Sequence, residues 1–169
     1  MRHSSNTNTL KYNGKKKKIV WDTGDAFVIS LKNNNFCVGH VLDQRMINTV
    51  RIALYDELLT ASEIRDVSFL CKTDKLISLI EVTKEQLEYG VWKIIGNKKS
   101  DLPVSKYPNE LYCSENWVGS VVYDAALAED FVNAFYALLP WDDWYDPHHL
   151  DKILVDISKK PKRLIFVKS

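Results

Sequence analysis

Carboxylates and histidines that can exchange protons cluster in the stretch PWDDWYDPHH at residues 140–149. Neighbouring carboxylates shift one another's proton affinity and histidine titrates near neutral pH, so such a group is suited to general acid–base chemistry. The candidate set is Asp142, Asp143, Asp146, His148 and His149. Adjacent aspartates on an irregular turn point in different directions, and a histidine pair in the first turn of a helix is commonly solvated or packed against rings. We therefore favour a non-catalytic interpretation of this set.

Other catalytic and metal-binding motifs are absent from the sequence. It contains no phosphate-cradling glycine loop, no Gly-x-Ser-x-Gly, no Cys-x-x-Cys and no His-Glu-x-x-His. The cysteines Cys37, Cys71 and Cys113 are odd in number and widely spaced, which favours buried free thiols over a disulfide framework or a zinc site. The sequence thus predicts a protein that is not an enzyme, with no catalytic residue, metal site or cofactor.

Charge is distributed unevenly along the chain. Residues 107–151 contain no lysine or arginine but carry nine carboxylates and ten aromatic side chains, a formal net charge of −9. The remaining residues hold 23 Lys and Arg against 13 Asp and Glu, a net charge of +10. Such an asymmetry indicates partners more than fold, and the acidic, aromatic segment suits the docking of a cationic protein.

The turn between two predicted C-terminal helices is the centre of the predicted binding surface, because aromatic rings alternate there with carboxylates. Exposed rings bury a large area at low entropic cost, and carboxylates attract and pair with arginine or lysine. The predicted interface comprises Trp141, Asp142, Asp143, Trp144 and Tyr145, with Asp124, Glu129 and Asp130 as a second group. In the alternative interpretation, the rings pack the corner between the two helices while the aspartates cap and solvate it.

A run of four lysines at residues 15–18 follows a polar start rich in Ser, Asn and Thr. With a small β-rich domain behind it, this run permits an alternative function as a small nucleic-acid-binding β-barrel module, since lysine–phosphate contacts release counterions. The segment of net charge −9 would repel a phosphate backbone, and the aromatic residues concentrate there instead of beside the lysines. We therefore interpret residues 1–18 as a flexible basic lead-in and expect no direct nucleic-acid partner.

Short alternating segments separated by turn residues predict antiparallel strands. The strand over residues 35–42 has apolar residues on both faces, as in a strongly curved sheet or a small barrel. Gly39 within it indicates a bulge or the close approach of another element. The predicted strands span residues 26–31, 35–42, 49–55, 67–72, 76–82, 91–95 and 117–123.

Helices and a final strand complete the predicted elements. Thr83 and Gln86 have the spacing of a capping box, and Gly90 ends the short helix that follows. An apolar stripe with Asp124 as N-cap predicts a longer helix, and Asp146 followed by proline predicts the start of another. The helices span about 83–90, 125–139 and 147–157, and a last short strand spans 164–167.

Together these patterns predict an α+β fold: a curved antiparallel sheet or small SH3-like barrel with two C-terminal helices packed on it. A single domain is expected over residues 19–169, mainly β over 19–122 and helical with a final short strand over 123–169. No apolar run is long enough to span a membrane, and the N-terminus lacks the apolar core of a signal peptide. We therefore expect a cytoplasmic protein without a membrane partner, and favour a monomer.

Three segments resemble a known family of bacterial proteins. The segments GDAFVISL at residues 24–31, FCVGHV at 36–41 and LEYGVWKIIG at 87–96 resemble the pattern of the immunity protein 26 family of polymorphic toxin systems. The resemblance covers roughly residues 21–96, and DPHHLDKIL at 146–154 is similar to a less specific segment of some members. It implies a non-catalytic immunity protein, made in the cytoplasm of the toxin-producing cell, that binds and neutralises the C-terminal domain of a cognate toxin delivered between neighbouring bacteria.

The class of toxin is predicted from charge alone, because members of one immunity family can face toxins of different activities. An acidic, aromatic surface suits a basic nuclease such as an RNase, whose lysines and arginines hold nucleic-acid phosphate. Carboxylates of residues 107–151 would pair with those cations and block the active site or its approach.

Overall fold

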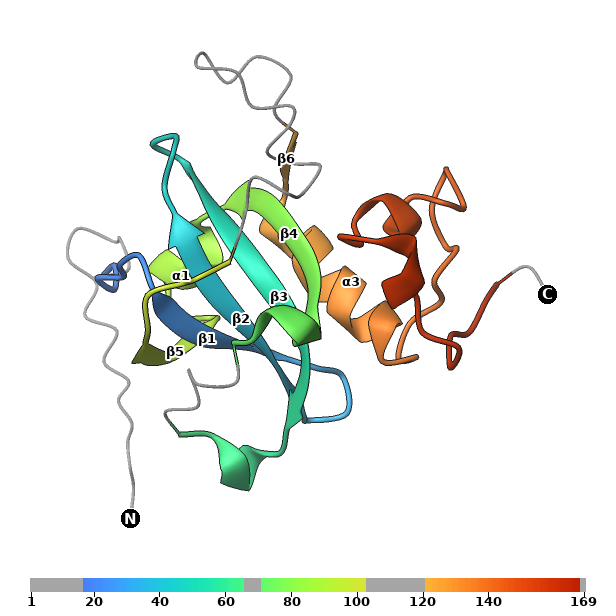
Figure 1. Ribbon diagram of the computed structural model, residues 1–169, viewed down its shortest axis with the longest axis horizontal. Coiled ribbons are helices and arrows are strands. Elements are labelled where there is room, and N and C mark those ends of the chain that lie inside the picture. The colour runs from blue at the N-terminus through green and yellow to red at the C-terminus, as the bar shows by residue number, and fades with distance from the viewer. Residues whose placement is uncertain (1–16, 66–70, 103–120, 168–169) are drawn as a thin grey trace.

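A sheet at the centre of the molecule organises the fold (Figure 1). The structure is a computed structural model that describes residues 17–65, 71–102 and 121–167. Its strands are β1 (Asp25–Ser30), β2 (Phe36–Asp43), β3 (Thr49–Leu59), β4 (Leu76–Thr83), β5 (Lys93–Asn97) and β6 (Val122–Tyr123). They form one six-stranded sheet in the order β5-β1-β2-β3-β4-β6, antiparallel except for the parallel pair β4 and β6. The predicted α+β class is confirmed, as an open sheet and not as a closed barrel.

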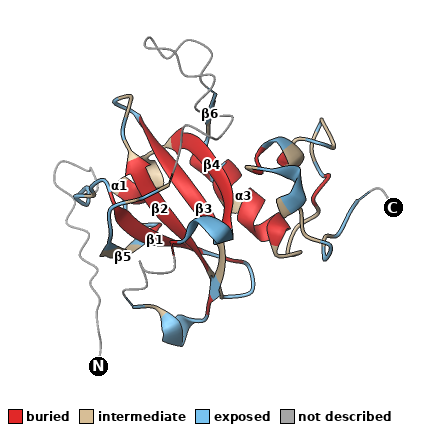
Figure 2. Ribbon diagram, viewed as in Figure 1, coloured by how far each residue is buried: buried red, intermediate tan, exposed pale blue. Residues whose placement is uncertain are grey.

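Both faces of the sheet are buried, as the pattern of the second strand predicted (Figure 2). Cys37 and Val41 of β2 belong to the core cluster that joins the sheet to helix α3 (Ala125–Phe135). Val38 and Leu42, on alternate positions, belong to a second cluster on the other face. Because successive strand residues point to opposite faces, a strand that is apolar throughout requires cover on both sides.

Gly39 leaves room for the side chain of the neighbouring strand to pack over β2. A Cβ atom at this position would lie 2.4 Å from Cζ of Phe27 on the neighbouring strand β1. The pairing of β2 with β3 also shifts register between Cys37 and Gly39, which is the irregularity that a glycine inside a strand indicates. The Phe27 ring in turn stacks on Trp92, with centroids 5.0 Å apart.

The short helix α1 (Glu85–Glu88) forms where predicted, but its capping box does not. The Thr83 hydroxyl oxygen accepts a hydrogen bond from the backbone N–H of Ala125 (3.0 Å), at the start of α3. The Gln86 amide donates to the Glu129 carboxylate (2.7 Å) on α3. Thr83, the last residue of β4, therefore joins the sheet to α3, and Gln86 joins α1 to α3, instead of both satisfying one helix end.

Helix α3 begins as predicted and ends earlier than predicted. The Asp124 carboxylate caps it by accepting from the N–H of Ala126 (2.8 Å), and the predicted apolar stripe is buried. Ala137 has a positive φ of 60°, and the N–H of Leu138 donates to the carbonyl of Asn133 (2.8 Å). This pattern of a left-handed residue with a six-to-one hydrogen bond is a Schellman end, so the helix stops at Phe135 and not at residue 139.

The prediction of a helix over residues 147–157 is wrong. Only its first turn, which starts at Asp146, forms as expected. The chain winds with 3-10 bonds, such as Ile153 N–H to the Leu150 carbonyl (3.1 Å), and forms only 3-10 helices at Leu150–Lys152 and Ile157–Lys159. The reason lies in β4, where the buried hydroxyl of Ser78 donates to the Ile153 carbonyl (2.7 Å). A buried hydroxyl needs such a partner, and satisfying it diverts the backbone from helical bonding.

The final strand predicted over residues 164–167 is also wrong, because this segment bonds to a loop and not to the sheet. The carbonyl of Ile165 accepts from the N–H of Trp141 (2.9 Å). The N–H of Val167 donates to the Asp142 carboxylate (2.7 Å). The last described residues are thus tied to the loop that follows α3.

Several predictions concern residues outside the described ones: most of the lead-in 1–18, the strand 67–72 apart from its last two residues, most of the strand 117–123, and Cys113. Of the other cysteines, Cys37 and Cys71 are free and buried, as predicted. Burial raises the pKa of the Cys71 thiol to about 12, so it is an unreactive core residue. Within the described part of the chain, no helix is long and apolar enough to cross a membrane.

Candidate functional site

The loop that follows α3 carries most of the predicted interface, and it begins inside the core. Trp141 is fully buried, with its ring centroid 5.8 Å from that of Phe131 on α3. Its indole N–H donates to the Asp151 carboxylate (2.8 Å). The Trp141 ring therefore stabilises the fold and offers no surface to a partner.

Asp142 is the second buried residue of this loop. Its carboxylate accepts the hydrogen bond from Val167 described above, and a buried carboxylate requires such bonds to offset its lost hydration. Together with the backbone bond between Trp141 and Ile165, this contact fastens the loop to the C-terminal segment. Asp142 is thus an anchor of the loop.

The next three residues, Asp143, Trp144 and Tyr145, reach the surface. Asp143 is exposed and Tyr145 is fully exposed. Trp144 is half-buried and lies against His149, with ring centroids 4.9 Å apart. Two buried residues therefore hold three outward-facing residues in position, which limits the conformational entropy that a partner must remove on binding.

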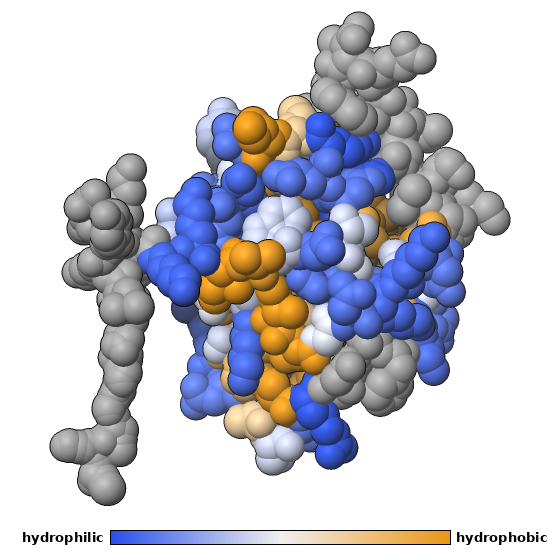
Figure 3. Space-filling view, turned by 90° about the vertical axis from the view of Figure 1, so that its left-hand side faces the viewer, coloured by the Kyte–Doolittle hydropathy of each residue, from blue (hydrophilic) through white to orange (hydrophobic). Residues whose placement is uncertain are grey.

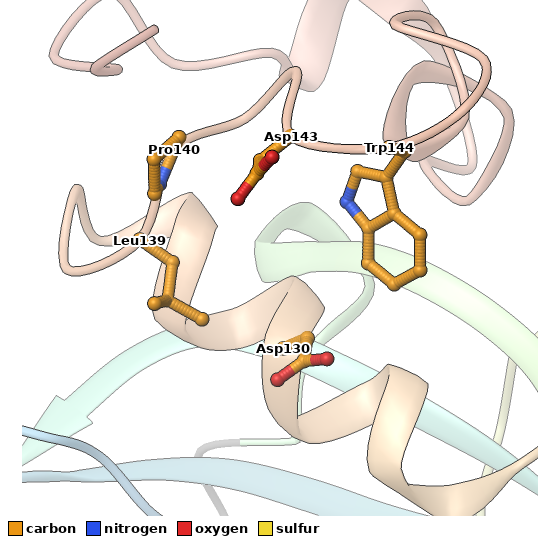
Figure 4. A pocket seen from close by; sticks show the side chains of 5 residues that line it. All are labelled: Asp130, Leu139, Pro140, Asp143 and Trp144. Atoms are coloured by element: carbon orange, nitrogen blue, oxygen red, sulfur yellow. The ribbon is translucent and has the colours of Figure 1, made fainter. Parts of the chain in front are cut away.

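A pocket of about 240 Å³ lies between this loop and α3, and we call it the acidic pocket. It is lined by Asp130, Leu139, Pro140, Asp143 and Trp144. Figure 4 shows the Asp143 carboxylate pointing from the loop into the pocket and Asp130 on the helix at its opposite side. Leu139 and Pro140 form one wall and the Trp144 indole forms the facing one.

The acidic pocket concentrates negative charge. Partial burial raises the pKa of the Asp130 carboxyl, and the neighbouring Glu129 carboxylate raises it further, with Lys32 acting in the opposite direction. Among the described residues, neither Asp130 nor Asp143 forms an ion pair or a side-chain hydrogen bond. The pocket therefore presents carboxylates whose charge is available to an incoming cation.

Other carboxylates of the lysine-free segment are neutralised by cations that come later in the chain. Asp146 pairs with Lys152 (2.6 Å) and Asp151 pairs with Lys160 (2.9 Å). Two of the nine formal negative charges of this segment are therefore paired in space with lysines that follow it in the chain. Glu110 and Glu115 lie outside the described residues.

The second predicted group divides between structure and surface. Asp124 caps α3, as the preceding description shows. Glu129 accepts hydrogen bonds from the Gln86 amide (2.7 Å) and from the Trp92 indole (3.0 Å), so it joins α3 to α1 and to the residue that precedes β5. Asp130 is exposed and lines the acidic pocket. Of these three, Asp130 is the residue whose carboxylate lines a surface pocket.

The candidate acid–base set does not converge on one point. Asp142 points to the backbone of Val167, whereas Asp146 pairs with Lys152. His148 lies 3.1 Å from the Asp151 carboxylate, and His149 packs on Trp144. Among the described residues, no three His, Cys, Asp or Glu side chains are grouped so that they could hold a metal ion.

A second hollow, of about 190 Å³, lies on the opposite side of the molecule, beside α1 and β5. Figure 3 faces that side and shows an apolar band among hydrophilic side chains. Ile19, Val20 and Val91 are exposed large apolar residues there. The described residues lining this hollow are Ile19, Leu87, Gly90, Trp92, Lys93 and Ile94, which include no carboxylate. Its chemistry therefore differs from that of the acidic pocket.

Sequence reasoning did not find two of the residues that line the acidic pocket, Leu139 and Pro140. Pro140 directly follows the helix predicted over residues 125–139 and was not assigned to the interface. The sequence did contain a signal for both residues, because they directly precede the acidic, aromatic turn. Residues so close along the chain can line the same site. What the sequence did not indicate is that α3 would end early and fold Leu139 back over its last turns.

The comparison with protein families identifies the scaffold that carries this site. The family model described as immunity protein 26 matches residues 22–117, more than half of the chain. The chain belongs to this family. The predicted resemblance is confirmed, and the protein is an immunity protein of a toxin system. No match was found among curated proteins or among solved structures.

The immunity protein 26 match contains β1 to β5 and α1, and it ends before α3. The acidic pocket, formed by residues 130–144, therefore lies beyond the matched part of this immunity protein. Membership of the family implies a cognate toxin as partner. Membership also suggests a non-enzymatic inhibitor. It does not indicate which surface contacts the toxin.

Proposed function

We propose that this immunity protein neutralises its cognate toxin by covering it with the surface formed by Asp130, Asp143, Trp144 and Tyr145. Family membership supports the role of a toxin antagonist. The observation that carries the choice of surface is the acidic pocket, where carboxylates without an ion pair among the described residues lie beside the half-buried Trp144 indole. Aromatic anchors next to carboxylates are the composition that gives tight binding to basic partners.

A basic nuclease such as an RNase is the toxin class that this surface suits best. Nucleases hold the phosphate backbone with lysines and arginines, so their active sites are positively charged. Carboxylates at Asp130 and Asp143 would pair with those cations, and Trp144 and Tyr145 would exclude water around the pairs. Nucleic acid could then no longer enter the site, and inhibition would be stoichiometric, in the cytoplasm, without any catalytic step.

Asp143→Lys is the sharpest test of this surface, because Asp143 is exposed and its replacement does not disturb the core. The binding partner is the purified C-terminal domain of the toxin encoded beside this gene, and affinity is measured by isothermal titration calorimetry. Reversal of a charge pair that becomes buried is expected to reduce the binding free energy by about 2–5 kcal/mol. Residual nuclease activity should rise in parallel when toxin and variant are mixed at equal concentration.

Asp22→Lys is the matched control, because Asp22 is also exposed but is not part of the acidic pocket. It lies just before β1, which pairs with the edge strand β5. It changes the net charge by the same amount and is expected to bind like the wild type. Equal affinity of both variants would exclude the acidic pocket from the interface. A toxin domain that degrades neither RNA nor DNA would refute the nuclease assignment while leaving the surface untouched.

A further inference from the structure

The acidic pocket has the size and walls of a receptor for a single side chain. Its volume of about 240 Å³ is below the roughly 300–1,000 Å³ of most small-molecule sites. One pair of walls is apolar, from Leu139 with Pro140 and from the Trp144 indole. The other pair carries the carboxylates of Asp130 and Asp143. A suitable occupant is therefore a cation at the end of an apolar stem.

We infer that the acidic pocket receives one arginine side chain of the toxin, an inference that rests on the proposed function. The guanidinium plane would stack on the Trp144 indole and donate from its two edges to Asp130 and Asp143. The arginine methylenes would contact Leu139 and Pro140 and exclude water from the charge pairs. Stacking on an indole and charge-assisted hydrogen bonds reinforce each other when both are desolvated.

Arginine fits this site better than lysine does. A guanidinium is planar, weakly hydrated and able to donate in several directions, whereas an ammonium is a strongly hydrated point charge. Apolar walls remove hydration from the occupant and therefore favour the more weakly hydrated cation. The two carboxylates lie on opposite sides of the pocket. A guanidinium can donate to both from two of its edges, whereas the single charge of an ammonium cannot match both positions as well.

A divalent metal ion is a poorer occupant than arginine. Calcium requires six to eight oxygen ligands and magnesium near-octahedral oxygen geometry. The pocket offers carboxylates from only Asp130 and Asp143, and its remaining lining consists of Leu139, Pro140 and Trp144. An organic cation uses these apolar walls, while a metal ion gains nothing from them.

The inference can be tested without the toxin, by titrating the immunity protein with N-acetylarginine amide and following the tryptophan indole N–H signals by NMR. The Trp144 signal is expected to shift with saturation in the millimolar range. Trp141, three residues earlier but fully buried, is the internal reference and should not shift. N-acetyllysine amide is expected to bind at least about threefold more weakly.

Two variants establish whether the pocket is responsible for the shift. Replacement of both Asp130 and Asp143 by asparagine keeps the shape and removes the charge, and should weaken arginine amide binding at least about tenfold. Trp144→Leu keeps an apolar wall and removes the ring, with a similar expected loss, and Trp144→Phe should recover part of it. Because these two variants lack the Trp144 indole N–H, their binding is followed by the backbone N–H signal of Asp143. The melting temperature of each variant shows that it is folded, as expected for residues that are exposed or half-buried.

Failure of this inference is distinguishable from failure of the proposed function. An absent Trp144 shift, equal binding of the lysine amide, or full binding by the asparagine double variant would each overturn the arginine assignment. The Asp143→Lys measurement with the toxin domain stands apart from these results. If that variant loses toxin affinity while the arginine amide does not bind, the surface is correct and the occupant is wrong.

Discussion

The sheet region, residues 25–97, and the C-terminal region, residues 121–167, are joined in one core but held together by different means. In the sheet region, backbone ladders, interrupted only locally by register shifts, join five antiparallel strands. In the C-terminal region, single contacts such as Ser78 to Ile153 and Asp142 to Val167 fasten irregular chain to the scaffold. The ladders specify the scaffold, whereas the single contacts place individual side chains at the surface.

This difference explains where the candidate site lies. A regular strand sends alternate residues to opposite faces, and both faces of this sheet are buried, so it leaves little side-chain surface for a partner. The irregular loop places Trp141 and Asp142 inside and the three following residues outside. Such a pattern is not available to a strand or to a helix, and it produces the acidic pocket.

Trp141→Ala is expected to have the largest effect on the coupling between the sheet region and the C-terminal region. Trp141 lies in the same core cluster as Phe27 and Ile52 of the sheet, so the two regions should unfold together. Removal of a buried tryptophan is expected to lower the free energy of unfolding of the whole domain by about 3–5 kcal/mol, measured by urea denaturation. The control is Trp144→Ala in the same loop, which is half-buried and should cost about 1 kcal/mol or less.

Equal costs at the two tryptophans would contradict the division of the loop into buried anchors and outward-facing residues. Two separate unfolding transitions in Trp141→Ala would show that the C-terminal region is an independent unit. They would contradict the view that the two regions share one core.

Gly39→Ala examines the sheet region with a smaller expected effect. The added methyl group would overlap the Phe27 ring, which is stacked on Trp92 and has little room to move. Overpacking of this kind should lower the free energy of unfolding by about 1–3 kcal/mol, seen as a lower melting temperature. Gly39→Ala should lower the free energy of unfolding by less in a Phe27→Leu background than in the wild type. Independent, additive effects would mean that the ring is not the cause.

Asp151→Asn examines the C-terminal region and is expected to have the smallest effect, about 1 kcal/mol at pH 7. Burial by itself would raise the pKa of Asp151, but hydrogen bonds from Lys160, Trp141 and His148 outweigh it and lower the pKa below its usual value of 3.8. Because the folded-state pKa is the lower one, this stabilisation is complete above the unfolded-state value and disappears as the pH falls through the folded-state value.

The measurement for Asp151→Asn is the difference in melting temperature between wild type and variant as a function of pH. The difference should shrink as the pH falls below about 4. A difference that does not depend on pH would show that the Asp151 charge contributes nothing and that only its hydrogen-bonding shape matters.

Elements with strong local signals were predictable. The strands 26–31, 35–42 and 76–82 agree with β1, β2 and β4 within one residue at each end, because alternation and turn residues are read over a few positions. The N-cap at Asp124 and the stripe of α3 are local for the same reason. The helix over 147–157 had equally good local signals and failed, since the carbonyl of Ile153 was taken by Ser78 of a distant strand.

The sequence by itself determined the composition of the site: an acidic, aromatic turn without lysine or arginine, following an amphipathic helix. Only the tertiary structure decided which of its members reach the surface. Trp141 and Trp144 are the same residue type in the same turn, yet one fills the core and the other lines a pocket. Likewise, Lys160 neutralises Asp151 while Asp143 keeps its charge available. Burial and ion pairing depend on residues far along the chain, so residue type and spacing cannot distinguish an anchor from a contact.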